Sequence, residues 1–330
     1  MSSELEGLLR SLAGQRVLVV GDVMLDEYLF GGVRRVSPEA PVLVVDVDRI
    51  TWAPGGAANV AANVRALGGE VSIVGLIGRD DAGRRLREQL DSMGVETGGL
   101  IEDPSRETTL KTRIIAGHQQ VVRVDREKRD RPDSKVAKLL SAATAARLAD
   151  AGAVVISDYD KGIIGQLTLD VVNTAKSQGR KVASNPKPKN LRWFHGVNLM
   201  TLNHPEAEAA SGETIDDEAS LRRAGEKILE RTGAEWVVIT RGAQGMSVFG
   251  ANGCPPEHIP VLPVEVFDVA GAGDTVVSTL TLALAAGADV MSAARLANFA
   301  GASVVRKLGV AQAVPAEIAH LIRESDNPGT

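Results

Sequence analysis

Short apolar runs alternate with amphipathic segments along most of the chain, and this alternation limits the possible folds more than any other feature. The runs lie at residues 16–20, 71–75, 153–157, 197–201 and 236–240. Each is almost continuously apolar, which is typical of strands buried on both faces of a parallel sheet. The runs therefore predict a parallel sheet with helices packed on both of its faces.

The segments between these runs have the apolar spacing of amphipathic helices. They lie at about residues 57–67, 81–93, 134–151, 163–178 and 217–231. The last begins with the acidic Asp217 and ends with the basic Arg231, an order that the helix dipole favours. Strands that alternate with helices predict an α/β fold, here a doubly wound, mostly parallel sheet. We expect a single domain over residues 1–330.

Two segments interrupt the alternation. A strand-like run at residues 41–50 has no helix after it, and residues 108–116 and 119–125 flank Gly117-His118 like the arms of a β-hairpin. Strands inserted into an α/β order form a separate small sheet, so we predict a β-lid over one end of the domain. The lid segments are residues 28–50 and 108–125. Their open strand edges and apolar faces predict a homodimer in which two lids pair.

The composition excludes several classes of protein. A formal net charge of −5, from 37 basic and 42 acidic residues, provides no positive surface for nucleic acid or anionic lipid. The single cysteine, Cys254, rules out an intrachain disulfide. The N-terminus has acidic residues where a signal peptide has basic ones, and the longest uncharged run, residues 275–288, is too short to span a bilayer. We therefore expect a cytoplasmic protein with no nucleic-acid and no membrane partner.

A glycine-rich turn, Gly271-Ala272-Gly273, connects an extended run to a helix that starts near Asp274. Unpaired N–H groups and the helix dipole make such a helix start an anion site, and glycines let a phosphate approach the backbone. A carboxylate would repel that phosphate unless it has a task, such as taking a proton from an attacking hydroxyl. The same residues also fit a plain turn in which Asp274 is a helix cap. They match neither a dinucleotide-binding fingerprint nor a P-loop.

Two other segments place polar groups where ligands bind. Gly55-Gly56 opens an alanine-rich helix that has Asn59 in its first turn. Asp22 follows the first predicted strand, and ligands of open α/β sheets bind at the carboxyl ends of strands. Asp22 could accept hydrogen bonds from sugar hydroxyls. The alternatives are a glycine-initiated helix without a ligand and an aspartate that belongs to a turn.

Together the three segments resemble the ribokinase-like (PfkB) carbohydrate kinases. Residues 55–59 look like the N-terminal signature of that family, and residues 268–274 look like its C-terminal signature. The resemblance covers essentially the whole chain. It implies the ribokinase-like fold, ATP-dependent phosphorylation of a sugar, and ATP and Mg²⁺ as cofactors.

Three more segments, residues 21–26, 35–42 and 157–162, resemble those members of the family that phosphorylate a heptose 7-phosphate. The resemblance implies transfer to the C1 hydroxyl of D-glycero-β-D-manno-heptose 7-phosphate, which gives the 1,7-bisphosphate on the way to the ADP-heptose of lipopolysaccharide core. Many such members carry an adenylyltransferase domain after the kinase. Because this chain stops near residue 330, we expect a stand-alone kinase with a separate adenylyltransferase.

The resemblance also implies roles for individual residues, with Asp274 as the general base and the backbone of residues 270–273 as the anion hole. The catalytic residues are Asp274, Gly271, Ala272 and Gly273. The residues expected to bind the phosphorylated sugar are Asp22, Arg35, Gly55, Gly56, Asn59, Lys111, Arg113 and Lys161. The residues expected to bind the nucleotide are Asn203, His204, Pro205, Glu206, Thr240, Arg241, Gly242, Ala270 and Asn298. Glu206 is expected to act on Mg²⁺ indirectly, through Mg-ATP.

The cation that holds the sugar phosphate is not fixed by the sequence. Arg34, Lys187 and Lys189 are further candidates, but Arg35 and Lys161 are favoured because they lie inside matching segments. Asn185 departs from the family, which has Asp there, and this removes a carboxylate near the phosphates.

Two other functions remain open at this stage. One is a ribokinase-like kinase for a hexose phosphate, ribose or a nucleoside, although an aromatic content of 3% disfavours a nucleoside. The other is a sugar-responsive module without catalysis, which an intact Asp274 disfavours.

Overall fold

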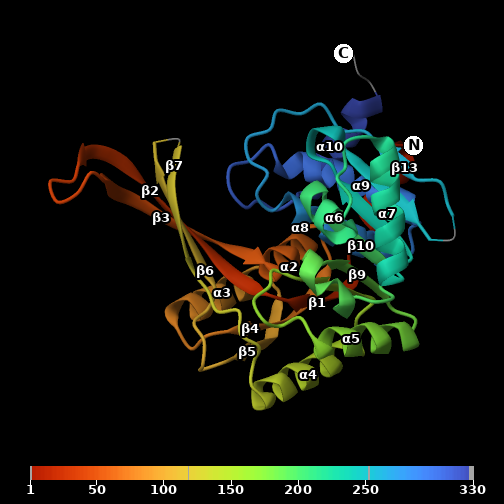
Figure 1. The fold of residues 1–330 in the computed structure, drawn as a ribbon, viewed down its shortest axis with the longest axis horizontal. Coiled ribbons are helices and arrows are strands. Elements are labelled where there is room, and N and C mark those ends of the chain that lie inside the picture. Colours follow the sequence, from red (N-terminus) through yellow and green to blue (C-terminus); the bar gives the residue numbers. More distant parts are fainter. Residues whose placement is uncertain (1, 118, 252, 327–330) are drawn as a thin grey trace.

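The computed structural model describes residues 2–117, 119–251 and 253–326. The strands of its larger sheet are β1 (Arg16–Gly21), β4 (Glu70–Ile77), β5 (Glu96–Glu102), β8 (Ala153–Ser157), β9 (Lys181–Asn185), β10 (Leu199–Asn203), β11 (Trp236–Thr240), β12 (Met246–Gly250) and β13 (Glu257–Ile259). Within the described residues these nine strands follow the order β13-β12-β11-β10-β9-β8-β1-β4-β5 (Figure 1). The strands from β11 to β5 are parallel, and β12 and β13 add an antiparallel edge.

Side chains alternate between two apolar cores, one on each face of this sheet. In β1, Val17 and Val19 join one core while Leu18 and Val20 join the other, and all four are at most 2% exposed. The predicted two-sided α/β arrangement is therefore confirmed, since residues of every predicted strand pack into these cores.

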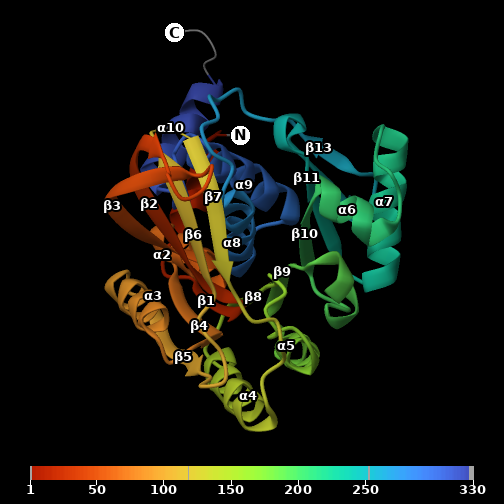
Figure 2. The ribbon, with the colours of Figure 1, turned by 60° about the vertical axis from the view of Figure 1, so that its left-hand side comes forward.

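Helices cover both faces of the sheet. The first core includes residues of α1 (Ser2–Ser11), α2 (Ala57–Ala66), α3 (Asp81–Ser92), α8 (Ala272–Ala285), α9 (Val290–Val304) and α10 (Pro315–Asp326). The second includes residues of α4 (Ser134–Leu148), α5 (Gln166–Ser177), α6 (His204–Ser211) and α7 (Glu218–Thr232). Figure 2 shows α6 and α7 on the opposite side of β10 and β11 from α8 and α9. Among the described helices, none combines the length and apolar character that a membrane span requires.

Local hydrogen bonds explain two shifted boundaries. The strand predicted at residues 197–201 begins at Leu199, because the Asn198 side chain accepts a hydrogen bond from the N–H of Val182 at 2.8 Å and fixes the turn before it. The helix predicted from residue 163 begins at Gln166, because the N–H of Ile163 bonds instead to the Asp22 carboxylate. Two short 3₁₀ turns, Pro188–Trp193 and Gly242–Gln244, complete the described helical elements.

A second sheet projects from the main body (Figure 1). Its strands are β2 (Val23–Val36), β3 (Leu43–Gly56), β6 (Leu110–Ala116) and β7 (Gln119–Arg126), in the order β3-β2-β6-β7. The central β2–β6 pair is parallel and the two outer pairs are antiparallel. We call this sheet the lid. His118, in the predicted turn of its second hairpin, lies outside the described residues.

The first hairpin of the lid, β2 and β3, is joined to the main body almost without linkers. Only Asp22 separates β1 from β2, and β3 ends at Gly56, directly before the first residue of α2. The base of the lid therefore lies next to the carboxyl end of β1, where α2 begins.

Candidate active site

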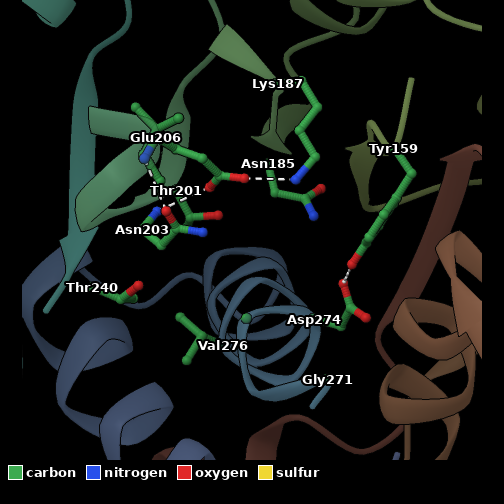
Figure 3. Close-up of a pocket in the computed structure, with 12 residues that line it drawn as sticks. Tyr159, Asn185, Lys187, Thr201, Asn203, Glu206, Thr240, Gly271, Asp274 and Val276 are labelled. Carbon is green, nitrogen blue, oxygen red and sulfur yellow. Dashed lines mark hydrogen bonds and ion pairs between the residues drawn. The ribbon is translucent and has the colours of Figure 1, made fainter. Parts of the chain in front are cut away.

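A cavity of about 190 Å³ lies where the carboxyl ends of β9, β10 and β11 meet the first turn of α8 (Figure 3). It is lined by Tyr159, Asn185, Lys187, Thr201, Leu202, Asn203, Glu206, Thr240, Gly271, Gly273, Asp274 and Val276. Six residues predicted for catalysis or nucleotide binding are thus brought together: Asn203, Glu206, Thr240, Gly271, Gly273 and Asp274. This edge of an open α/β sheet is the usual ligand site because helices begin there.

Asp274 is held in the cavity by a hydrogen bond to each of its carboxylate oxygens. It lies in the first turn of α8 and is 4% exposed. The Asn59 amide donates to its Oδ2 at 2.9 Å, and the Tyr159 hydroxyl donates to its Oδ1 at 2.6 Å. Burial raises the pKa of Asp274 to about 6, while the two donors oppose that rise. The carboxylate is therefore ionised at neutral pH and available as a proton acceptor.

Gly271 is required at the start of α8 on two grounds. Its φ of +80° lies in the left-handed region that other residues disfavour. A β-carbon there would also lie only 2.8 Å from Nδ2 of Asn59, the atom that donates to Asp274, and would push that amide away. This glycine therefore allows α2 and α8 to meet at the carboxylate.

Two of the backbone N–H groups predicted to form the anion hole are already bonded within the chain. The N–H of Ala270 donates to Oδ1 of Asp268 at 2.9 Å, and the N–H of Ala272 donates to the carbonyl of Val269 at 3.2 Å. Within the part of the chain that the structure describes, the N–H groups of Gly271, Gly273 and Asp274 have no hydrogen-bond acceptor. These three groups are the ones free to bind a phosphate oxygen.

The opposite wall of the cavity is fixed by a capping box at the start of α6. The N–H of Glu206 donates to Oδ1 of Asn203 at 2.9 Å, and the N–H of Asn203 donates to Oε2 of Glu206 at 3.0 Å. The other oxygen of Glu206 lies 2.6 Å from Nζ of Lys187 (Figure 3). His204 and Pro205 form the first turn of α6 without lining the cavity.

The donor set of this wall fits Mg²⁺ that arrives with a nucleotide. Oδ1 of Asn185 is buried and, within the described residues, has no hydrogen-bond partner. It lines the same cavity as the Glu206 carboxylate. Mg²⁺ prefers oxygen ligands and is commonly bound through one or two carboxylates together with substrate phosphates. No cluster of three or more His, Cys, Asp or Glu side chains that could hold a metal occurs in the described ranges.

Besides His204, Pro205 and Ala270, three residues predicted on the nucleotide side lie outside the cavity lining. The Arg241 guanidinium is held by Glu218 at 2.7 Å, and Asn298 donates to the carbonyl of Pro260 at 2.9 Å. Gly242 belongs to the 3₁₀ turn that follows Arg241. The structure thus engages these side chains in local contacts rather than in the cavity.

The base of the lid brings a second set of predicted residues together. Asp26 is 3% exposed and forms an ion pair with Arg113, and its neighbour in register on β6 is Lys111. A β-carbon on Gly55 would lie 2.1 Å from Oδ2 of Asp26, so this glycine makes room for the carboxylate. Lys111 is half-buried and has no ion-pair partner among the described residues. Burial lowers the pKa of Lys111.

The two cations favoured by the sequence are placed differently from what we expected. Lys161 is 7% exposed, and its Nζ lies 2.5 Å from the Glu127 carboxylate. Arg35 is exposed near the outer end of the lid, in register with Val44. Of the predicted phosphate ligands, Lys111 is therefore the half-buried cation whose charge is not already paired within the described chain.

Asp22 is buried, but its carboxylate is occupied by the backbone. Its Oδ2 accepts hydrogen bonds from the N–H groups of Tyr159 at 2.8 Å and Lys161 at 3.0 Å. Its Oδ1 accepts a longer one from Ile163 at 3.4 Å. Burial raises the pKa of Asp22 to about 6. In the structure Asp22 thus shapes the loop after β8, where we had predicted contacts with sugar hydroxyls.

Sequence reasoning gave no role to two residues near the carboxylate. Tyr159 lies two residues after the predicted strand at 153–157, at the edge of the sheet where ligands bind. This position could have indicated a role in the site. Asn63 lies one helical turn after Asn59, so the two side chains share a face of α2.

Solved structures first define the fold class. Ribokinase from Arabidopsis thaliana, complexed with ribose and ATP, superposes with a TM-score of 0.74 at 19% identity, over 94% of this chain and 99% of that one. Phosphofructokinase-2 from Escherichia coli, in complex with fructose-6-phosphate, gives a TM-score of 0.77 at 19% identity, over 96% and 100%. The chain therefore has the ribokinase-like fold.

The family follows from the sequence. The model of the pfkB family carbohydrate kinases matches residues 15–317, and the chain belongs to that family. It is a sugar kinase, as the resemblance of its two signatures implied. The bifunctional protein HldE of Caulobacter vibrioides is 45% identical over 320 residues, and that of Pelobacter propionicus is 42% identical over 319. Each alignment covers 96% of this chain, which spans 65% of the length of either relative.

Proposed function

We propose that this kinase transfers the γ-phosphoryl group of Mg-ATP to the C1 hydroxyl of D-glycero-β-D-manno-heptose 7-phosphate. The product is the 1,7-bisphosphate, a precursor of ADP-heptose. The observation that carries the chemistry is a buried carboxylate, Asp274, in the same helix turn as three free N–H groups. The heptose assignment is supported by the resemblance of residues 21–26, 35–42 and 157–162 and by the 42–45% identity with HldE.

The proton of the acceptor hydroxyl passes to Asp274 as the hydroxyl oxygen attacks the γ-phosphorus. The carboxylate is ready for this step because Asn59 and Tyr159 each donate to a different oxygen and hold its plane. A positioned base contributes roughly 10²–10⁴-fold to such a reaction. Because each carboxylate oxygen accepts only one of these hydrogen bonds, each keeps a lone pair that can accept the proton of the substrate hydroxyl.

Negative charge that develops on the transferred group is stabilised by fixed donors. The N–H groups of Gly271, Gly273 and Asp274 are already aligned by the helix, so they need no reorganisation. Lys187 adds a positive charge on the facing wall, held by Glu206. Glu206 and Asn185 would hold Mg²⁺ with the nucleotide, and the metal would neutralise phosphate charge.

Lys111 is proposed to bind the 7-phosphate. Leaving an ammonium group half-buried without a counter-charge is unfavourable, and an anionic ligand would remove that cost. Asp26 and Arg113 neutralise each other beside it and leave the charge of Lys111 available. The phosphorylated end of the sugar would then lie under the lid, with the C1 hydroxyl toward Asp274.

The acceptor assay tests the proposal directly. ADP release is measured with Mg-ATP and, in parallel, heptose 7-phosphate, fructose 6-phosphate, ribose and adenosine. We expect turnover that strongly favours the heptose. Turnover on another of the four would keep the kinase chemistry and reject the substrate, and no turnover on any of them would also reject the heptose as acceptor.

We also propose that the lid pairs with the lid of a second copy. Its exposed apolar residues are Val33, Val36, Val42, Leu43, Val47, Ile50, Val121, Val122 and Val124. Such a patch on one sheet is typical of an interaction surface. Light scattering should give twice the 34.7 kDa of one chain, and the double variant Val122→Asp, Val124→Asp should give a single chain. A wild-type protein of 34.7 kDa would contradict the pairing.

A further inference from the structure

Asn63 lies outside residues 55–59 and 268–274, which look like the family signatures, and its side chain forms four hydrogen bonds. It is fully buried in α2, one turn after Asn59. Its amide connects three elements: α2, α8 and the segment that leads into α10. A buried amide in an apolar core is costly unless it is fully bonded, so its bonds indicate a specific task.

The orientation of the Asn63 amide is determined by its partners. The backbone N–H of Ala313 can only donate, and it lies 3.1 Å from Oδ1 of Asn63. The Thr275 hydroxyl donates to the same oxygen at 2.9 Å. The opposite end, Nδ2, therefore points to Asn59, where it donates to the side-chain oxygen at 3.1 Å and to the backbone carbonyl at 3.0 Å.

The same reasoning then fixes Asn59. Because its Oδ1 is engaged by a donor from Asn63, its Nδ2 must face Asp274, to which it donates at 2.9 Å. The reversed amide would oppose two N–H groups at one end and two oxygens at the other. The contact between the two N–H groups is repulsive, and the contact between the two oxygens is repulsive while Asp274 is ionised, so Asn63 disfavours the reversed state.

We propose that Asn63 is a positioning residue that selects which end of the Asn59 amide faces the carboxylate of Asp274. The proposal rests on the role as general base proposed above for Asp274. A donor toward Asp274 favours the ionised carboxylate, whereas an oxygen in that place favours the protonated acid, which can donate to it. Asn63 thus keeps the base in its reactive form without touching it.

Three other titratable groups around Asp274 also shift its pKa. Tyr159, from the loop after β8, donates to the carboxylate. Asp26, on β2, disfavours ionisation, and Lys187, after β9, favours it. None of these three bonds to Asn63, so a variant at Asn63 leaves them in place.

The test is a direct titration of Asp274 in the full chain. Protein labelled with ¹³C at aspartate carboxyl carbons is titrated by NMR, and the Asp274 signal is assigned by its loss in Asp274→Asn. In Asn63→Leu we expect the pKa of Asp274 to rise by roughly one pH unit, because the Asn59 amide can then reverse and accept a hydrogen bond from the protonated acid. The acidic limb of the kcat profile should move by the same amount, with the alkaline plateau within about threefold of wild type.

Asn198→Leu is the matched control. Asn198 is also buried, and its amide bonds to Val182 at 2.8 Å and to Glu235 at 2.7 Å, at the amino ends of β9 and β10. We expect this variant to melt at a lower temperature without a change in the Asp274 titration. If Asn63→Leu does not fold, Asn63→Ala removes the same amide without adding branched volume.

An Asp274 pKa that is unchanged in the Asn63 variant, or equally shifted in Asn198→Leu, would overturn the proposal. The NMR titration needs no substrate. A protein that phosphorylates no heptose but shows the Asn63-dependent shift would therefore contradict the proposed substrate and leave the positioning role intact.

Discussion

The surroundings of Asp274 and the base of the lid are built in opposite ways. Around Asp274, each oxygen of the carboxylate has a donor, and the donor from α2 is itself held by Asn63. At the base of the lid, Lys111 is half-buried and lacks an ion-pair partner within the described residues. The paired carboxylate of Asp274 is held in place for proton transfer, whereas the unpaired ammonium group of Lys111 can bind an anionic ligand.

The two sheets differ in the same sense. Every residue of β8 in the main sheet is buried, whereas every described residue of β7 in the lid is exposed. The main sheet is covered by helices of the same chain on both faces. The lid has surface that its own chain does not cover, and we propose that substrate and a second copy bind there.

The largest expected effect is at the paired region. Asp274→Asn should lower kcat by about 10²–10⁴-fold, because an amide cannot accept the proton of the attacking hydroxyl. Affinity for ATP, measured by calorimetry, should stay close to that of wild type, since the free N–H groups are unaltered. A variant that retains most of its turnover would remove the distinction between a catalytic region and a binding region.

At the lid, the expected effect is on binding alone. Lys111→Met should raise KM for the phosphorylated sugar by roughly 10–100-fold, the value of a hydrogen bond to a charged group, while kcat and KM for ATP change little. Steady-state kinetics with both substrates measure this. Lys138→Met, on the exposed face of α4, serves as the control. An equal rise in both KM values would indicate a folding defect and would break the comparison.

A smaller effect is expected at the joint between the two sheets. Asp22→Ala leaves the buried N–H groups of Tyr159, Lys161 and Ile163 without their acceptor, which should cost about 2 kcal/mol of unfolding free energy. Urea denaturation measures it. The exposed Asp150→Ala should change stability by less than about 0.5 kcal/mol.

The smallest effect is that of pH on the wild-type enzyme. Because burial raises the pKa of Asp274 to about 6, turnover should be half-maximal near pH 6 and decline below it. Unfolding does not explain this loss. The folded-state pKa values of Asp22 and Asp274 lie above the ordinary value, so their protonation on acidification favours the fold, and that contribution disappears as pH rises through about 6. Circular dichroism across the same range checks this, and a limb near pH 4 would contradict the assignment.

The main sheet could be predicted because its strands are buried on both faces. Residues 153–157 and 236–240 coincide with β8 and β11 as predicted. The edge strands β5 and β13 and the neighbouring β12 were missed, because glycines and polar residues such as Gly98, Gly99 and Ser247 interrupt their apolar pattern. The strand β9, KVASN, is short and has polar residues at both ends, so it gave no signal either.

Within the site, the glycine-rich turn predicted Gly271 and Asp274, and the structure places both in the lining of the cavity. It could not show which charges are already paired. Arg35 and Lys161 were favoured over Lys111 because they lie in recognisable segments, but only tertiary structure reveals the contact of Lys161 with Glu127. Asp22 was predicted to bind the sugar because it follows a strand. The sequence does not show that the backbone N–H groups of Tyr159 and Lys161 donate to its carboxylate.

The direct passage from β3 into α2 has a mechanical consequence. Gly56 ends the strand and caps the helix, and Asn59 lies in the first turn beyond it. The lid and this turn are therefore rigidly connected. A rotation of the lid that is not absorbed at Gly55 and Gly56 would shift the Asn59 side chain relative to Asp274. The hydrogen bond from Asn63 to Asn59 would oppose that shift.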